Sequence, residues 1–338
     1  MKILVTGGAG FIGSHTCVEL INADYEPIVV DNFSNSREFI LGRIEKITDQ
    51  KITFYRGDCA DYAFLQTVFK KEKDIAGVIH FAAYKAVGES INQPLKYYRN
   101  NLNSLLTVIE TMQKFGTEKL VFSSSATVYG DPDSNPIFET APRKKANCPY
   151  GNTKTICEDI IADTVNGQKN ISAVALRYFN PIGAHPSGLI GELPLGAPNN
   201  LVPYVTQTAA DIREKLTVFG NDYSTPDGSG VRDFIHVIDL AQAHIKTLKF
   251  LETAEAPFYD VFNVGTGSGN SVLEIIKTFE KVNGVKVPYA IGPRREGDIA
   301  ACFADASKIK KAMGWQAQKT LEDSLRDAWN WQQGLDTN

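Results

Sequence analysis

A glycine-rich turn near the N-terminus constrains the fold of this 338-residue chain more than any other feature of its sequence. Gly7, Gly10 and Gly13 follow Lys2–Thr6, an apolar run typical of a buried parallel strand, and precede an apolar stripe at helical spacing. Glycines at such a turn let the backbone approach a pyrophosphate, which binds at the helix N-terminus. A second strand ends at Asp31, whose carboxylate can accept both ribose hydroxyls of an adenosine. The order of these elements predicts a dinucleotide site, and the carboxylate favours NAD because it repels the 2′-phosphate of NADP.

Strand and helix patterns alternate through the first half of the chain. Apolar strand patterns end near Asp31, Asp58, Phe81 and Ser125, and helical patterns lie between them. This alternation predicts an α/β fold with a Rossmann-type, doubly wound parallel sheet, in which ligands gather at the carboxyl ends of the strands. We therefore predict an NAD-binding Rossmann domain over residues 1–180.

The pattern changes after residue 180. A loop rich in Gly and Pro spans residues 181–200, and the strand and helix patterns that follow are shorter. We expect residues 181–338 to form mainly a smaller, mixed α/β lobe that binds a substrate. The helical pattern at 238–251 is expected to return to the first sheet, whereas the strand pattern at 262–264 is assigned to the smaller lobe.

The composition argues against several classes of function. The formal net charge of -4 gives no reason to expect a nucleic-acid partner or a membrane surface. No apolar run approaches the ~20 residues that span a bilayer, and a strand at the very N-terminus leaves no room for a signal peptide. The 5 cysteines and 5 histidines lack the spacing of disulfide frameworks or metal ligands, so no metal site is predicted. We expect a cytoplasmic protein.

Tyr150 and Lys154 lie four residues apart at the start of a helical pattern and therefore share one helix face. An isolated tyrosine, with a pKa of about 10, is a poor base at neutral pH. A nearby ammonium and an oxidised nicotinamide both favour its phenolate. Ser125 lies at the end of an earlier strand, where its hydroxyl can bridge a substrate and Tyr150. These three residues are the predicted catalytic groups, with Tyr150 as the acceptor of a substrate proton.

With these residues the chain resembles the extended short-chain dehydrogenase/reductases, and among them the 4-epimerases of UDP-glucose and UDP-galactose. The resemblance extends from Lys2 to the last helix. Its most specific stretches are His80–Ser90, Phe122–Gly130, Leu176–Pro181 and Gly230–Val237. It implies an isomerase that interconverts UDP-glucose and UDP-galactose through a transient 4-keto sugar while NAD stays bound, and it implies a homodimer.

The motifs and the resemblance together assign two ligand sites. The predicted NAD site consists of Gly7, Gly10, Phe11, Ile12, Gly13, Asp31, Asn32, Ser34, Asn35, Ser36, Asp58, Cys59, Phe81, Ala82, Ala83, Lys85, Asn100, Ser123, Tyr150, Lys154 and Tyr178. The predicted UDP-hexose site consists of Lys85, Ser125, Tyr150, Phe179, Asn180, Asn200, Leu201, Val218, Phe219, Arg232, Arg295, Asp298 and Cys302. Arg232 and Arg295 suit a diphosphate because a guanidinium can meet it with paired hydrogen bonds.

Cys302 bears on the breadth of the predicted substrate range. In the family this position resembles a gate beside the sugar 2-substituent, where a bulky tyrosine accompanies restriction to the plain hexoses. A cysteine leaves room for an acetamido group, so we expect interconversion of UDP-GlcNAc and UDP-GalNAc as well. The alternative is a thiol that fills the core while another group closes the pocket.

Other functions fit parts of the sequence. The nearest are another nucleotide-sugar epimerase or a dehydratase of the same superfamily. Dehydratases carry Asp-Glu as acid and base where Ala126 and Thr127 stand here, so expulsion of the 6-hydroxyl would lack its catalysts. A non-catalytic NAD(P)-sensing protein could share the fold, but it would not need Ser125, Tyr150 and Lys154.

Overall fold

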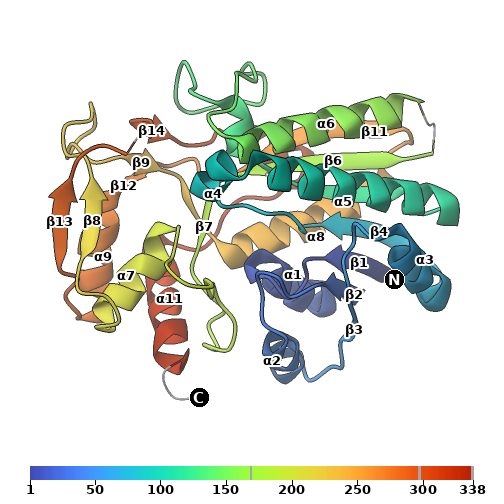
Figure 1. Cartoon of the computed structure of the whole chain (residues 1–338), viewed down its shortest axis with the longest axis horizontal. Coiled ribbons are helices and arrows are strands. Elements are labelled where there is room, and N and C mark those ends of the chain that lie inside the picture. Colours follow the sequence, from blue (N-terminus) through green and yellow to red (C-terminus); the bar gives the residue numbers. More distant parts are fainter. Residues whose placement is uncertain (168–169, 296–297, 336–338) are drawn as a thin grey trace.

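The structure, a computed structural model, describes residues 1–167, 170–295 and 298–335 (Figure 1). Its largest sheet has seven strands, in the order β11-β6-β5-β4-β1-β2-β3. Its strands are β1 (Lys2–Thr6), β2 (Glu26–Asp31), β3 (Thr53–Arg56), β4 (Ile75–His80), β5 (Lys119–Ser125), β6 (Ser172–Tyr178) and β11 (Phe258–Val264). Every neighbouring pair is parallel, which confirms the predicted doubly wound sheet.

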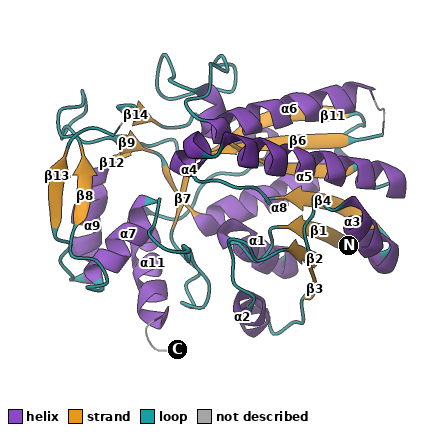
Figure 2. Cartoon of the chain, viewed as in Figure 1, coloured by secondary structure: helices purple, strands orange, loops and turns teal. Residues whose placement is uncertain are grey.

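Helices cover both faces of this sheet (Figure 2). One face packs against α1 (Phe11–Asn22), α2 (Phe39–Thr48) and α8 (Val237–Thr253), and the other against α3 (Tyr62–Glu72), α5 (Pro94–Phe115) and α6 (Pro149–Gly167). Within β1, Ile3 and Val5 belong to the first apolar core and Leu4 to the second. Successive side chains of a strand point to opposite faces, so a strand buried on both sides is apolar throughout.

Local signals set the bounds of α5. Pro94 occupies its first turn, where the missing N–H costs nothing, and Gly116 caps its C-terminus in the left-handed conformation with φ 72. These two residues set the bounds of α5 at Pro94 and Phe115. The short helix α4 (Val87–Asn92), which precedes α5, was not predicted from the sequence.

A smaller group of elements lies beside the sheet, on the left of Figure 1. It contains two-stranded and three-stranded sheets, and α9 begins with a capping box formed by Ser271 and Glu274. The helices are α7 (Leu201–Ala209), α9 (Val272–Asn283) and α11 (Leu321–Leu335). The strands are β7 (Asn180–Ile182), β8 (Leu216–Phe219), β9 (Val231–Arg232), β10 (Phe234–His236), β12 (Asn270–Ser271), β13 (Tyr289–Gly292) and β14 (Ala301–Cys302).

Two later segments of the chain, α8 and β11, belong to the large sheet and its helices rather than to the smaller group of elements. Helix α8 packs against α1, and β11 pairs with β6 along its whole length. The assignment of the strand at 262–264 to the smaller lobe was therefore wrong, because an apolar strand pattern does not reveal which distant strand it will pair with. The division of the chain at residue 180 stays a prediction. Short helix α10 (Ser307–Met313) also packs against β11.

Candidate active site

The predicted glycine turn joins β1 to α1 and has the geometry that only glycine allows. Gly7 has φ 72, and a Cβ there would stand 3.0 Å from the backbone nitrogen of Ala82. A Cβ on Gly13 would stand 2.2 Å from the carbonyl oxygen of Gly7. The N-cap residue of α1, Gly10, supplies no side-chain bond to the first helical N–H groups. The turn is thus a close-packed cradle at a helix N-terminus, which fits a pyrophosphate.

Asp31 is fixed at the carboxyl end of β2, beside this turn. Its Oδ2 accepts a hydrogen bond of 3.0 Å from the backbone N–H of Ala9. Its Oδ1 accepts bonds of 2.8 Å from the N–H of Phe33 and 2.9 Å from the hydroxyl of Ser36. A carboxylate offers about four acceptor sites, so capacity for a ribose hydroxyl remains. Asn32 lies close by and donates to Asp58, 3.3 Å away.

The three predicted catalytic residues meet at the end of β5 and the start of α6. Burial raises the pKa of Tyr150 to about 12, while a hydrogen bond with Ser125 acts in the opposite direction. Lys154 Nζ donates a bond of 2.6 Å to the carbonyl of Ser123 and lies 5.9 Å from the centre of the Tyr150 ring. Burial lowers the pKa of Lys154 to about 8. The arrangement brings together three groups with different roles in proton transfer. The phenol oxygen can accept a proton, the serine hydroxyl can relay it, and the ammonium can stabilise the resulting negative charge.

Further predicted NAD-site residues surround this group. The hydroxyls of Ser123 and Tyr178 form a hydrogen bond to each other. Tyr178 and Phe81 both contact the buried ring of His244, with centroids 6.1 Å and 4.7 Å away. Ala82 donates to Thr6 of β1 at 3.4 Å. The ends of β1, β4, β5 and β6 therefore meet at one edge of the sheet, as the topology requires.

The predicted diphosphate residues gather on the smaller elements. Asp298 Oδ1 lies 2.9 Å from Arg295 Nη2 and 3.5 Å from Arg232 Nη2, and the Arg295 guanidinium lies 5.8 Å from the centre of the Phe219 ring. One carboxylate thus orients two guanidinium groups beside an exposed aromatic ring. Val218, the residue before Phe219, is buried in the core of this lobe.

Cys302 lies against both parts of this site. Its strand β14 pairs with β9, in register with Arg232, and its side chain packs on the cluster that contains Phe179. Burial raises the pKa of its thiol to about 11, with Arg232 acting in the opposite direction. The thiol is therefore protonated at neutral pH and half-buried among predicted substrate-site residues.

Glu192, which was not predicted from the sequence, joins two residues that were. Glu192 Oε1 accepts a bond of 2.6 Å from Asn200 and lies 3.1 Å from Lys85 Nζ. The carbonyl of Glu192 accepts a bond of 3.0 Å from the indole of Trp331. Glu192 stands in the Gly- and Pro-rich loop after β7, where no periodicity marks individual residues. No signal in the sequence could have singled it out.

Other predicted residues take less central places. Cys59 is buried in the apolar core beside α3 and α5, so its side chain faces the protein. Asn100 donates to its neighbour Asn101 at 3.0 Å. Three of the predicted residues are exposed on loops or at strand ends: Ser34, Asn35 and Asn180. Four others are partly exposed: Phe11, Ile12, Ala83 and Leu201. These seven are arranged around the glycine turn, the sheet edge and the start of α7.

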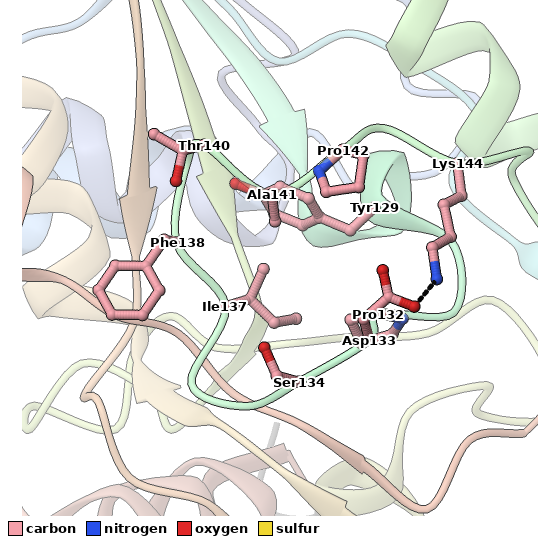
Figure 3. A pocket seen from close by; sticks show the side chains of 10 residues that line it. All are labelled: Tyr129, Pro132, Asp133, Ser134, Ile137, Phe138, Thr140, Ala141, Pro142 and Lys144. Atoms are coloured by element: carbon pink, nitrogen blue, oxygen red, sulfur yellow. Dashed lines mark hydrogen bonds and ion pairs between the residues drawn. The ribbon is translucent and has the colours of Figure 1, made fainter.

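A pocket of about 200 Å³ lies outside this site, between the short helix η1 (Ala126–Tyr129) and the loop that follows it (Figure 3). Its lining includes Tyr129, Ile137 and Phe138, and an ion pair joins Asp133 to Lys144 at one side. None of the predicted site residues lines it.

The fold and the arrangement of serine, tyrosine and lysine define an extended short-chain dehydrogenase/reductase. Three comparisons agree with that class. A family model described as GDP-mannose 4,6 dehydratase matches residues 4–328. The UDP-glucose 4-epimerase of Bacillus subtilis is 55% identical over 98% of this chain and 97% of its own length. The chain belongs to the UDP-glucose 4-epimerase family.

Solved structures lead to the same family. The UDP-glucose 4-epimerase of Bifidobacterium longum, in complex with NAD+ and UDP, has a TM-score of 0.95 at 48% identity, over 99% of this chain and 98% of that one. The enzyme of Stenotrophomonas maltophila, with bound NAD and formylated UDP-arabinopyranose, has a TM-score of 0.96 at 47% identity, over 100% and 99%. The similarity therefore spans both the large sheet and the smaller elements.

Proposed function

We propose that this protein binds NAD and interconverts UDP-glucose and UDP-galactose. The observation that carries the proposal is the meeting of Ser125, Tyr150 and Lys154 beside a glycine turn built for a pyrophosphate. The similarity to epimerases crystallised with NAD and with UDP or a UDP-sugar supports it. When bound, NAD accepts and returns the hydride of the sugar C4.

The residues of the chain supply the proton chemistry. Tyr150 accepts the proton of the sugar 4-hydroxyl, with Ser125 as the bridge between the two oxygens. The Lys154 ammonium stabilises the phenolate, whose formation burial would otherwise disfavour. Loss of the O4 proton and of the C4 hydrogen leaves a 4-keto sugar. Tyr150 gives the proton back when C4 is reduced on the opposite face, so the reaction involves no net oxidation.

The intermediate must turn over within the site without leaving it. The paired guanidinium groups of Arg232 and Arg295 suit the diphosphate, which is the part of the substrate common to both epimers. Holding the nucleotide rather than the hexose leaves the sugar ring free to rotate. Binding and chemistry are thereby divided between the smaller elements and the sheet edge.

The substrate range is proposed to include UDP-GlcNAc and UDP-GalNAc. Support comes from Cys302, a small side chain that is packed beside Phe179 and in register with Arg232. A hydroxyl-to-acetamido change needs space, and a small residue at this point leaves it.

The protein is further proposed to form a homodimer through α4 and α5. Four apolar side chains on these helices are exposed: Val87, Ile91, Leu95 and Leu106. Leu95 is 77% exposed and Leu106 is 41% exposed, and their spacing on α5 corresponds to about three helical turns. A second copy of the same face would cover this stripe symmetrically.

The alternative functions would require different residues in the site. The matching family model is named for a dehydratase, but Ala126 and Thr127 carry no carboxyl group beside Ser125. A sensing protein would have no use for the proton-transfer group. The test is the ultraviolet spectrum of the purified protein together with conversion of UDP-galactose without added cofactor. Protein that retains NAD(H) but leaves UDP-galactose unchanged would refute the epimerase proposal.

A further inference from the structure

Three successive residues at the end of β5, Ser123, Ser124 and Ser125, make polar contacts with helix α6. Two are the contacts of Tyr150 and Lys154 described above. The third is made by Ser124, whose hydroxyl donates a bond of 2.5 Å to Glu158 Oε1. Because Tyr150, Lys154 and Glu158 follow one another at intervals of four residues, they lie along one side of the helix.

Glu158 is held in place by a buried ion pair. Its carboxylate accepts bonds of 2.9 Å and 2.6 Å from Nε and Nη2 of Arg177, and these side chains are only 1% and 5% exposed. Arg177 lies in β6 and donates from Nη1 to the hydroxyl of Tyr129 at 3.0 Å. Tyr129 donates in turn to Asn263 of β11 at 2.6 Å. The sheet itself therefore fixes the carboxylate that receives the Ser124 hydroxyl.

Stability alone does not account for this ion pair. Taking two charges out of water offsets most of their mutual attraction, so apolar side chains of similar size could hold the helix as firmly. Apolar contacts, however, tolerate sliding, whereas a set of fully paired hydrogen bonds has one geometry. The pair is thus better suited to specifying one position of α6 than to holding it on the sheet.

We propose that Ser124, Glu158 and Arg177 are positioning residues, which set where α6 lies along β5 and thereby align Tyr150 with Ser125. The role rests on the proposed epimerase function, because it assigns these residues a task within that reaction. None of the three needs to touch substrate or cofactor.

A positioning role should affect kcat and KM differently. Misplacing reacting groups by about 1 Å can lower a rate about a hundredfold. The diphosphate residues Arg232 and Arg295 lie outside α6 and pair with Asp298, so we expect them to keep their positions when α6 shifts. A change in the positioning residues should therefore lower kcat and leave KM for the UDP-hexose unchanged.

The experiment compares Ser124→Ala with a matched control, Thr117→Val. Ser124→Ala removes one buried hydroxyl and leaves the ion pair intact, and kcat for UDP-galactose should fall about tenfold with KM and bound NAD unchanged. Thr117, two residues before β5 begins, is also buried, and its hydroxyl donates a bond of 2.8 Å to the carbonyl of Ile75 in β4. Its loss should lower Tm as much as the loss at Ser124 and leave kcat at the wild-type value.

A second variant, Glu158→Gln, keeps the shape of the side chain and removes its charge. Its kcat should fall further than that of Ser124→Ala, again without a change in KM. If Glu158→Gln does not fold, the Ser124→Ala and Thr117→Val pair still decides the question. Wild-type kcat in Ser124→Ala overturns the proposal, and so does an equal loss of kcat in Thr117→Val. A wild-type protein that does not convert UDP-galactose contradicts the proposed function itself.

Discussion

Cys302 and Arg232 stand opposite each other as register partners in the short parallel pair of β14 and β9. The guanidinium of Arg232 contacts Asp298, and the thiol of Cys302 packs beside Phe179. A residue proposed to bind diphosphate and a residue proposed to limit the size of the sugar are thus fixed by the same few backbone bonds. The size of residue 302 should therefore affect the sugar site without moving the diphosphate site.

Cys302→Tyr should restrict the enzyme to the plain hexoses. The larger ring would fill the space for an acetamido group, and overfilling costs ~1–3 kcal/mol, which corresponds to at least about a fivefold loss of activity on UDP-GalNAc. Both substrate pairs should be assayed in wild type, Cys302→Tyr and the control Cys302→Ala. If the wild type ignores UDP-GalNAc, or the tyrosine variant retains that activity, the proposed gate is wrong.

Tyr150→Phe should retain NAD and lose nearly all epimerase activity. The only lost group is a hydroxyl that bonds Ser125, so the fold is kept while the proton acceptor disappears. A fall in kcat of about a thousandfold is expected. Ser125→Ala should slow turnover less. Single-turnover assays with bound-NAD quantification test this, and near-normal turnover in Tyr150→Phe would exclude the proposed mechanism.

Asp31→Ala should weaken retention of NAD and reduce discrimination against NADP. The carboxylate anchors the glycine turn through Ala9 and the loop after β2 through Ser36, and its remaining acceptor site is predicted to bind the ribose. Loss of a charged hydrogen bond costs ~1.5–3 kcal/mol, or about ten- to a hundredfold in affinity. Asp31→Asn, which keeps one acceptor, should be intermediate. An unchanged NAD content after purification in both variants would show that the carboxylate does not bind the cofactor.

The protein should lose stability as the pH falls below about 6.5. Burial lowers the pKa of His15 and His80 to about 3 and that of His244 to about 4. Between these values and about 6.5 the unfolded chain binds protons that the folded protein does not, so the free energy of unfolding decreases on acidification. His244→Phe should remove about 2 kcal/mol of this decrease at pH 5. Urea unfolding at two pH values measures it, and an unaltered pH dependence would count against a neutral, buried His244.

Leu95→Glu should convert the proposed homodimer to a monomer. The side chain is 77% exposed on α5, and a charge there would have to be buried in the symmetric contact. Leu195→Glu is the matched control, because Leu195 is 39% exposed and lies in the loop before α7 rather than on α4 or α5. Sedimentation velocity distinguishes the two species. If the Leu95→Glu variant is still a dimer, the dimer contact lies elsewhere. If the wild type is a monomer, the homodimer proposal is wrong.

The sequence by itself determined the local elements of the sheet domain. The glycine turn, the acidic end of β2 and the bounds of α5 are set by residues close together in the chain, through backbone freedom, side-chain periodicity and capping. The position of Ser125 at a strand end and of Tyr150 and Lys154 on one helix face was predictable for the same reason. Local interactions decide such features before any long-range contact forms.

Only the tertiary structure decided which distant segments meet. The pairing of β11 with β6, the link from Glu192 to Lys85 and Asn200, and the buried pair of Glu158 with Arg177 join residues with no common local pattern. Such contacts depend on how strands align and how loops close across the whole chain. Their cost is the entropy of loop closure and desolvation, and their gain appears only when the core has packed around them.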